Sequence, residues 1–159
     1  MDNQKPLREH LIKLLKGGQA HATLEDAVED LPLELTGVKP TYVPYSIWQL
    51  LEHIRIAQWD IVEFSHNPKH VSPKWPDEFW PKHSKPESEK VWHETLHKIR
   101  QDRKRMIELI SDHKHDLYAP FPHGEGQNLL REVLLIADHT SYHIGEIILM
   151  RLLLKAWDK

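Results

Sequence analysis

Cysteine is absent from the 159 residues of this chain. The protein therefore forms no disulfide, offers no thiolate to a metal ion and has no thiol nucleophile of its own. A chain without disulfides suits a reducing compartment, and we expect a cytoplasmic protein.

Long apolar runs and an excess of one charge are also missing. No apolar run approaches the roughly 20 residues that span a bilayer, and the polar residues 1–4 lack the apolar core of a signal peptide. The formal net charge is −3, which gives no electrostatic reason for binding nucleic acid. We therefore expect neither a membrane nor a nucleic acid as a partner.

Strand-like alternation and internal repeats are absent, whereas apolar residues recur at helical spacing. This periodicity predicts four long helices, at residues 4–16, from a capping box at Ser46 to about 65, from a capping box at Ser84 to about 110, and at about 128–154. A short helix behind Thr23 and an irregular stretch follow the first of them. The pattern predicts an all-α fold, a single four-helix-bundle domain over residues 1–159 with a long crossover between the first and second long helices.

Residues 66–86 contain five prolines together with Trp75, Phe79 and Trp80. The prolines exclude regular structure, and the aromatic side chains favour an ordered loop packed over one end of the domain. Two interpretations stay open, a hydrophobic cover on the core and a wall of a binding pocket, to which Trp48 and Tyr142 could also contribute.

Two histidines, His139 and His143, lie in the last predicted helix, which is apolar on most of its faces. A spacing of four residues places both rings on one face of a helix, and this is how one helix supplies two ligands to a metal ion. The alternative is a pair of core histidines, each hydrogen-bonded to a neighbour. Ile136 and Ile147 are expected on the same inward face.

His53 is the other histidine that lies well inside a helix and beside its apolar face. Three imidazoles and an open fourth position are typical of a catalytic zinc site, and three neutral ligands leave the full dipositive charge on the ion. His93 and His97 repeat the four-residue spacing, but they lie on a polar, basic face and are predicted not to bind metal. The remaining histidines are expected to be solvated or at the edge of the core: His10, His21, His66, His70, His83, His113, His115 and His123.

Several stretches together resemble the DinB-like (YfiT-like) family of damage-inducible bundle proteins. They are residues 44–53, 55–60 and 75–81, with Leu130-Arg131-Glu132, Asp138-His139 and Tyr142-His143-Ile144-Gly145 in the last helix. The resemblance implies a bundle, usually dimeric, that binds zinc or nickel through the histidines at positions 53, 139 and 143. Where relatives often have Gln, this chain has Glu146, which could orient a ligand ring or fill the open position.

The resemblance also implies a metal-dependent transferase, because some members resemble enzymes that use a low-molecular-weight thiol. We expect the metal to activate such a thiol for attack on a small electrophile. Two alternatives stay open. One is a metal-stabilised stress-response or binding module without turnover, and the other is a metal-dependent hydrolase in which the ion activates water.

A homodimer is expected from the last helix. If its histidines point inward, leucines at positions 135, 149 and 153 remain partly exposed on other sides, and a contiguous apolar patch usually marks an interface. The competing interpretation is a monomer in which the first helix and the crossover cover these leucines.

Overall fold

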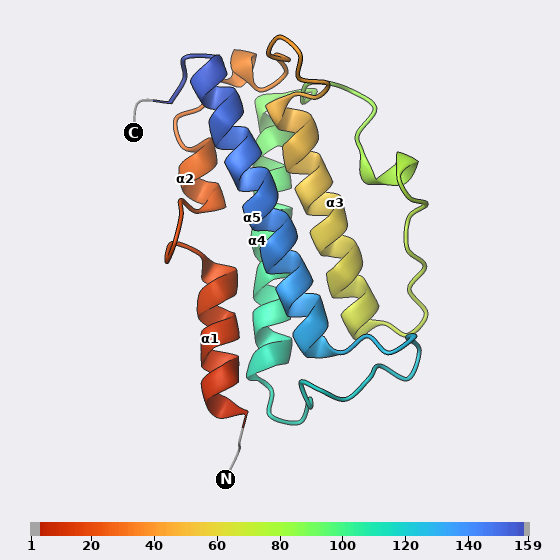
Figure 1. Ribbon diagram of the computed structural model, residues 1–159. Coiled ribbons are helices and arrows are strands. Elements are labelled where there is room, and N and C mark those ends of the chain that lie inside the picture. The colour runs from red at the N-terminus through yellow and green to blue at the C-terminus, as the bar shows by residue number, and fades with distance from the viewer. Residues whose placement is uncertain (1–3, 158–159) are drawn as a thin grey trace.

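Four long helices lie side by side in the computed structural model: α1 (Lys5–Lys16), α3 (Ile47–His66), α4 (Glu89–Ser111) and α5 (Leu129–Leu153) (Figure 1). The structure describes residues 4–157, and no β-strand occurs in that range. The predicted all-α bundle is thereby confirmed. Residues 1–3, most of the segment tested above for a signal peptide, lie outside the described range.

The directions of the helices show a second long crossover, between α3 and α4. The predicted one joins α1 to α3 and contains the short helix α2 (Leu24–Val28) and the 3-10 turn η1 (Leu33–Leu35). Figure 1 shows that α3 and α4 run in the same direction, so the segment between them, which contains η2 (Asp77–Phe79), returns along the outside of the bundle. The proline-rich loop is therefore an ordered strap, as the sequence favoured, but it runs along the side of α3 and does not cover one end of the domain as expected.

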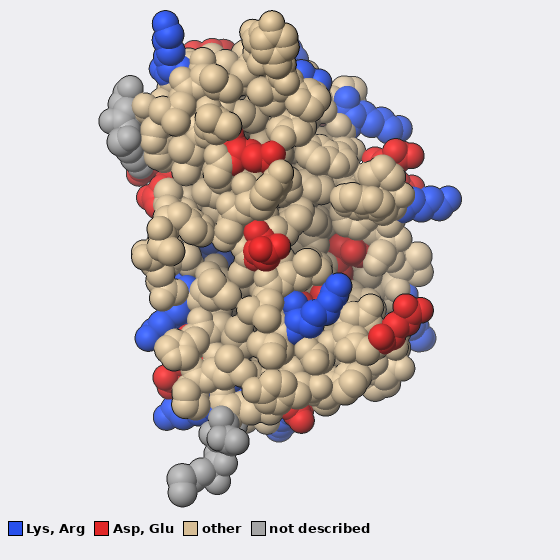
Figure 2. Space-filling model, viewed as in Figure 1, with Lys and Arg blue, Asp and Glu red and all other residues tan. Residues whose placement is uncertain are grey.

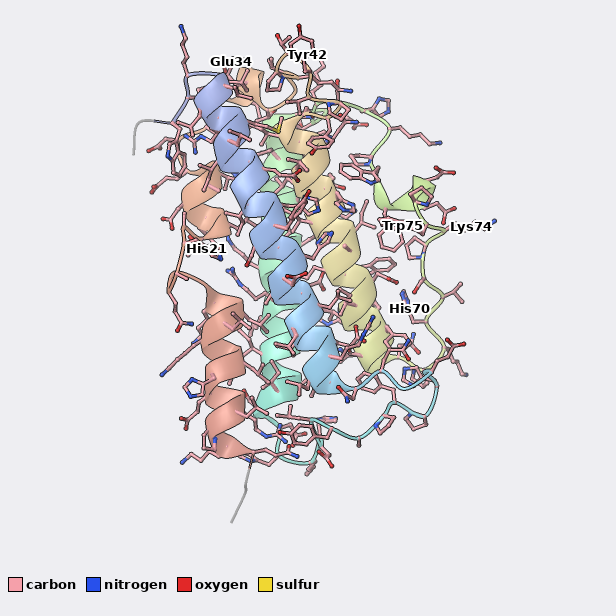
Figure 3. The ribbon with its side chains drawn as sticks, in the orientation of Figure 1. His21, Glu34, Tyr42, His70, Lys74 and Trp75 are labelled. Atoms are coloured by element: carbon pink, nitrogen blue, oxygen red, sulfur yellow. The ribbon has the colours of Figure 1, made fainter. Side chains whose placement is uncertain are left out.

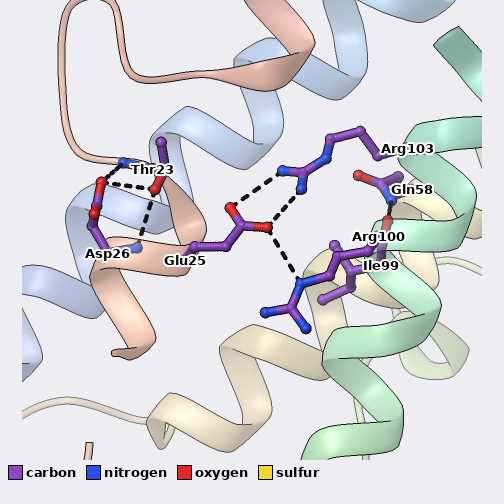
Figure 4. A network of polar contacts seen from close by, with 7 residues as sticks. All are labelled: Thr23, Glu25, Asp26, Gln58, Ile99, Arg100 and Arg103. Carbon is purple, nitrogen blue, oxygen red and sulfur yellow. Dashed lines mark hydrogen bonds and ion pairs between the residues drawn. The ribbon is translucent and has the colours of Figure 1, made fainter. Parts of the chain in front are cut away.

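One corner of the bundle is shared by α1 and the short helix α2. Figure 1 shows α2 above α1, both beside α5, and residues 17–23 join the two helices. The corner is tied to its neighbours by ion pairs, since Glu25 of α2 accepts hydrogen bonds from Arg103 of α4 and lies 3.5 Å from Arg100 (Figure 4). From α5, the buried Arg151 donates to the carbonyls of Ala27, in the last turn of α2, and Glu29, its C-cap. These carbonyls would otherwise lack partners inside the helix.

The caps explain where α2, α3 and α4 begin. Ser46 forms the predicted capping box, and Thr23 forms another at the start of α2. The box predicted at Ser84 is wrong, because the N-cap of α4 is Ser88, four residues later. The residue before a proline is disfavoured in a helix, and Lys85 precedes Pro86. The Ser84 carbonyl instead accepts a hydrogen bond from the Ser46 hydroxyl, which fixes the strap to the start of α3.

The core follows the inward faces of the long helices. Buried apolar side chains of α3, α4 and α5 form most of it, among them Ile54, Ile99 and Ile147. The outer face of α5 is different, because Leu149, Leu152 and Leu153 are each more than half exposed. A search of the described helices finds none long and apolar enough to cross a membrane.

Candidate metal centre

Three histidines from two helices converge beside the strap. His53 of α3 and His139 and His143 of α5 each present a ring nitrogen, and these atoms all lie within 4.8 Å of one another. Within the described residues 4–157, this is the group of His, Cys, Asp and Glu side chains that could hold a metal ion. The fold thus brings together the three residues that the sequence singled out, although His53 and His139 are 86 residues apart in the chain.

Outside partners fix which nitrogen of two rings faces the centre. His53 donates from Nδ1 to the Phe79 carbonyl at 2.8 Å, and His143 donates from Nδ1 to Glu146 Oε2 at 2.5 Å. Because Nδ1 carries the proton in this arrangement, Nε2 of each neutral ring keeps its lone pair for the centre. This is the usual outer arrangement of metal-binding histidines.

The spacing of the nitrogens also fits a bound ion. Nε2 of His53 and Nε2 of His139 are 3.0 Å apart. Two nitrogens on one tetrahedral zinc ion, each about 2.05 Å from it, are separated by about 3.4 Å, so a small adjustment would accommodate the ion. Imidazole ligands suit zinc and nickel among the divalent ions.

Burial favours the neutral form of two of the rings, His53 and His139. Burial, reinforced by the two neighbouring histidines, lowers the pKa of His139 to about 4. The pKa of His53 is also lowered, mainly by burial. Neutral imidazole is the form that binds a metal, so these residues are ready to act as ligands near neutral pH.

The strap forms one wall of the centre. Trp80 stacks on His53, with ring centroids 4.0 Å apart and an interplanar angle of 4°. Figure 3 shows Trp75 on the strap beside the bundle, and its ring lies 6.5 Å from that of His53. On the α5 side, Tyr142 lies 5.0 Å from the His143 ring and is 66% exposed. Trp48, the other proposed wall residue, is instead buried against Trp92 in the core.

A carboxylate and a phenol complete the surroundings of His143. Tyr45 donates its hydroxyl proton to Glu146 Oε1 at 2.6 Å, while the other carboxylate oxygen accepts from His143. Of the two roles predicted for Glu146, the structure therefore shows the one that orients a ring. Sequence reasoning missed Tyr45, because its partner is 101 residues away and no local pattern links them.

The other histidines lie elsewhere. His93 and His97 are exposed on α4, as predicted. His70 was expected to be solvated, but its side chain is largely buried and its Nε2 contacts Asp60 at 2.7 Å (Figure 3). His123 is also partly buried, because its ring packs on two phenylalanines and its Nε2 donates to the Phe64 carbonyl. Both belong to loops that pack on the bundle rather than extend into water.

Comparison with known proteins gives one finding. The family model described as the DinB superfamily matches residues 18–147, which contain all three histidines. No curated protein and no solved structure matches the chain.

Proposed function

The chain belongs to the DinB superfamily, and we propose that it binds one divalent metal ion, zinc or nickel, through His53, His139 and His143. The observation that carries this proposal is the convergence of three imidazole nitrogens, two of them on rings whose Nδ1 protons are held from outside. Without an ion, His139 can donate a proton from Nε2 to the lone pair of His53 Nε2, 3.0 Å away. With its proton on Nδ1 instead, His139 would offer Nε2 as the third ligand atom.

We further propose that the protein is a metal-dependent transferase that uses a low-molecular-weight thiol. Three protein ligands leave a fourth position for a small molecule. A divalent ion lowers the pKa of a thiol that binds it, from an ordinary value of about 8.5. The chain has no cysteine, so the reacting thiol would come from a cofactor, and a reducing cytosol would keep that cofactor in its thiol form.

The residues around the centre support a small organic substrate. Trp75 and Tyr142, both largely exposed, approach it from the strap and from α5. Exposed aromatic rings beside a metal centre favour a flat or apolar electrophile, because they can cover it without hydrogen bonds. In the proposed transfer the thiol sulfur bonds to an electrophilic carbon while the bond from that carbon to its leaving group breaks. The leaving group departs with the electron pair of that bond, and the thiol proton goes to water or to the leaving group.

Thiol binding can be tested on protein purified without a tag and loaded with cobalt(II). Adding 2-mercaptoethanol should produce the charge-transfer absorption of a sulfur ligand, and the His139→Ala variant should show no such band. A cobalt spectrum that thiol leaves unchanged would favour one of the alternatives. A module without turnover has its own support, since the three histidines link α3 to α5. A hydrolase would require that water occupy the fourth position.

We also propose a homodimer formed through the outer face of α5. The exposed residues Leu135, Tyr142, Leu149 and Leu152 recur at spacings of seven and three along that face, which is the repeat of helices that pair with one another. Gly145 lies in the same row, and no side chain or other segment lies within 4 Å of where a Cβ would stand. A second helix could therefore approach closely at this point.

A further inference from the structure

We propose that Tyr45 and Glu146 are positioning residues that fix His143 for the metal and give the centre one compensating negative charge. The proposal rests on the metal-binding function above and extends it. It concerns a residue before α3 and a residue on α5, neither of them a metal ligand in our account.

The first step is the chain of hydrogen bonds behind His143. Glu146 is one helical turn beyond His143, so its carboxylate can reach back to the Nδ1 proton. Its two oxygens have separate partners, Oε2 toward His143 at 2.5 Å and Oε1 toward the Tyr45 hydroxyl at 2.6 Å. Burial and this hydrogen bond raise the pKa of Tyr45 to about 12, so the phenol stays a donor at neutral pH. The carboxylate therefore cannot rotate without losing one of its bonds.

The second step is that Tyr45 also reaches the other side of the centre. Its ring stacks on Trp80 with centroids 5.6 Å apart, and Trp80 stacks on His53. Tyr45 thus contacts the supports of a ligand on α3 and of a ligand on α5. Because Ser46, the next residue, is the N-cap of α3, the backbone at this point is fixed by the capping box.

The third step is the charge of the centre. Three neutral imidazoles contribute no charge, so a divalent ion would leave two positive charges in a largely buried place. The Glu146 carboxylate is hydrogen-bonded to the ring of His143. Its negative charge would reduce the net charge of the centre from two to one. One monoanion at the fourth position, such as a thiolate, would then make the centre neutral, which is favourable where water is largely excluded.

This account predicts opposite changes in two affinities. Glu146→Gln should weaken cobalt(II) binding by about 10- to 100-fold, because the ring loses its charged partner. The same variant, loaded with cobalt at saturating concentration, should bind azide about threefold more tightly or better, because the centre keeps its second positive charge. Cobalt affinity is measured by competition with a chelator, and azide affinity by titration of the visible spectrum.

Two further variants separate positioning from folding. Tyr45→Phe keeps the ring that stacks on Trp80 and removes only the hydroxyl, so it should weaken cobalt binding less than Glu146→Gln does. Tyr42→Phe is its control, because Tyr42 is fully exposed, and it should have no effect. Asp138→Asn removes an exposed carboxylate next to His139 and tests for charge acting through solvent. It should leave both affinities nearly unchanged.

Each outcome decides the proposal. If Glu146→Gln weakens both cobalt and azide binding, Glu146 has only a structural role and the charge argument is wrong. Unchanged affinities in Glu146→Gln and Tyr45→Phe would remove the positioning role as well. If the unmodified protein takes up no cobalt, the proposed function itself fails, and this inference fails with it.

Discussion

At the scale of single residues, burial favours the neutral form of His53 and of His139. Burial holds the pKa of His139 at about 4, against about 6.5 for free imidazole. A lowered pKa means that at pH 6 the ring carries its lone pair rather than a second proton. Protons therefore compete poorly with a metal ion until the pH falls toward the lowered value.

Acidification should therefore release the metal. We expect full metal content at pH 7 and loss on acidification with a midpoint below pH 6.5, because proton binding to His53 and His139 removes their lone pairs. The metal content of protein passed over a desalting column at a series of pH values measures this. A content still unchanged well below pH 4 would argue against histidine ligands.

The residues of the centre differ in how far the sequence could reveal them. His139 and His143 were predictable because a helical repeat fixes their common face, and His53 because it lies beside an apolar stripe. The contacts of Tyr45 with Glu146 and of His70 with Asp60 join segments whose relative placement depends on the whole fold. Local pattern carries no information about such pairs.

At the scale of elements, caps and periodicity predicted three helix starts well. The hydroxyls of Thr23 and Ser46 and the side chain of Asn128 each accept a hydrogen bond from the first turn of their helices. The start of α4 was misplaced because Ser84 and Ser88 both offer a suitable hydroxyl. The choice between them depends on Pro86 and on the contact of Ser84 with Ser46, which is a tertiary contact.

The sequence pattern could not predict the direction of α4 either. Periodicity shows that a helix exists and which face is apolar, but not whether it runs parallel to its neighbour. The strap is long enough to return to the end of the bundle where α3 begins, and packing of Trp75 and Trp80 on His53 of α3 stabilises that path. A wall of the candidate centre is the consequence of this topology.

At the scale of the whole molecule, the exposed face of α5 predicts association. Figure 2 shows only scattered charged side chains over this helix, with most of the Lys and Arg at the edges of the view. We expect a dimer in solution, and replacing Leu149 and Leu152 with Glu should convert it to a monomer, because two charges would be buried in each copy of the interface.

Light scattering over a dilution series measures the mass. Leu33→Glu is the matched control, since Leu33 is an exposed leucine that belongs to η1 and not to α5, and it should leave the dimer intact. A mass of 18.8 kDa for the unmodified protein at tens of micromolar would rule the dimer out.

The central claim is that three histidines of one chain bind one divalent ion, and metal analysis of protein purified without a tag tests it most directly. The account predicts about one zinc or nickel ion per chain, most of it lost in each of His53→Ala, His139→Ala and His143→Ala. The His93→Ala and His97→Ala variants should keep it. Metal that disappears in the last two variants and persists in the first three would contradict the account.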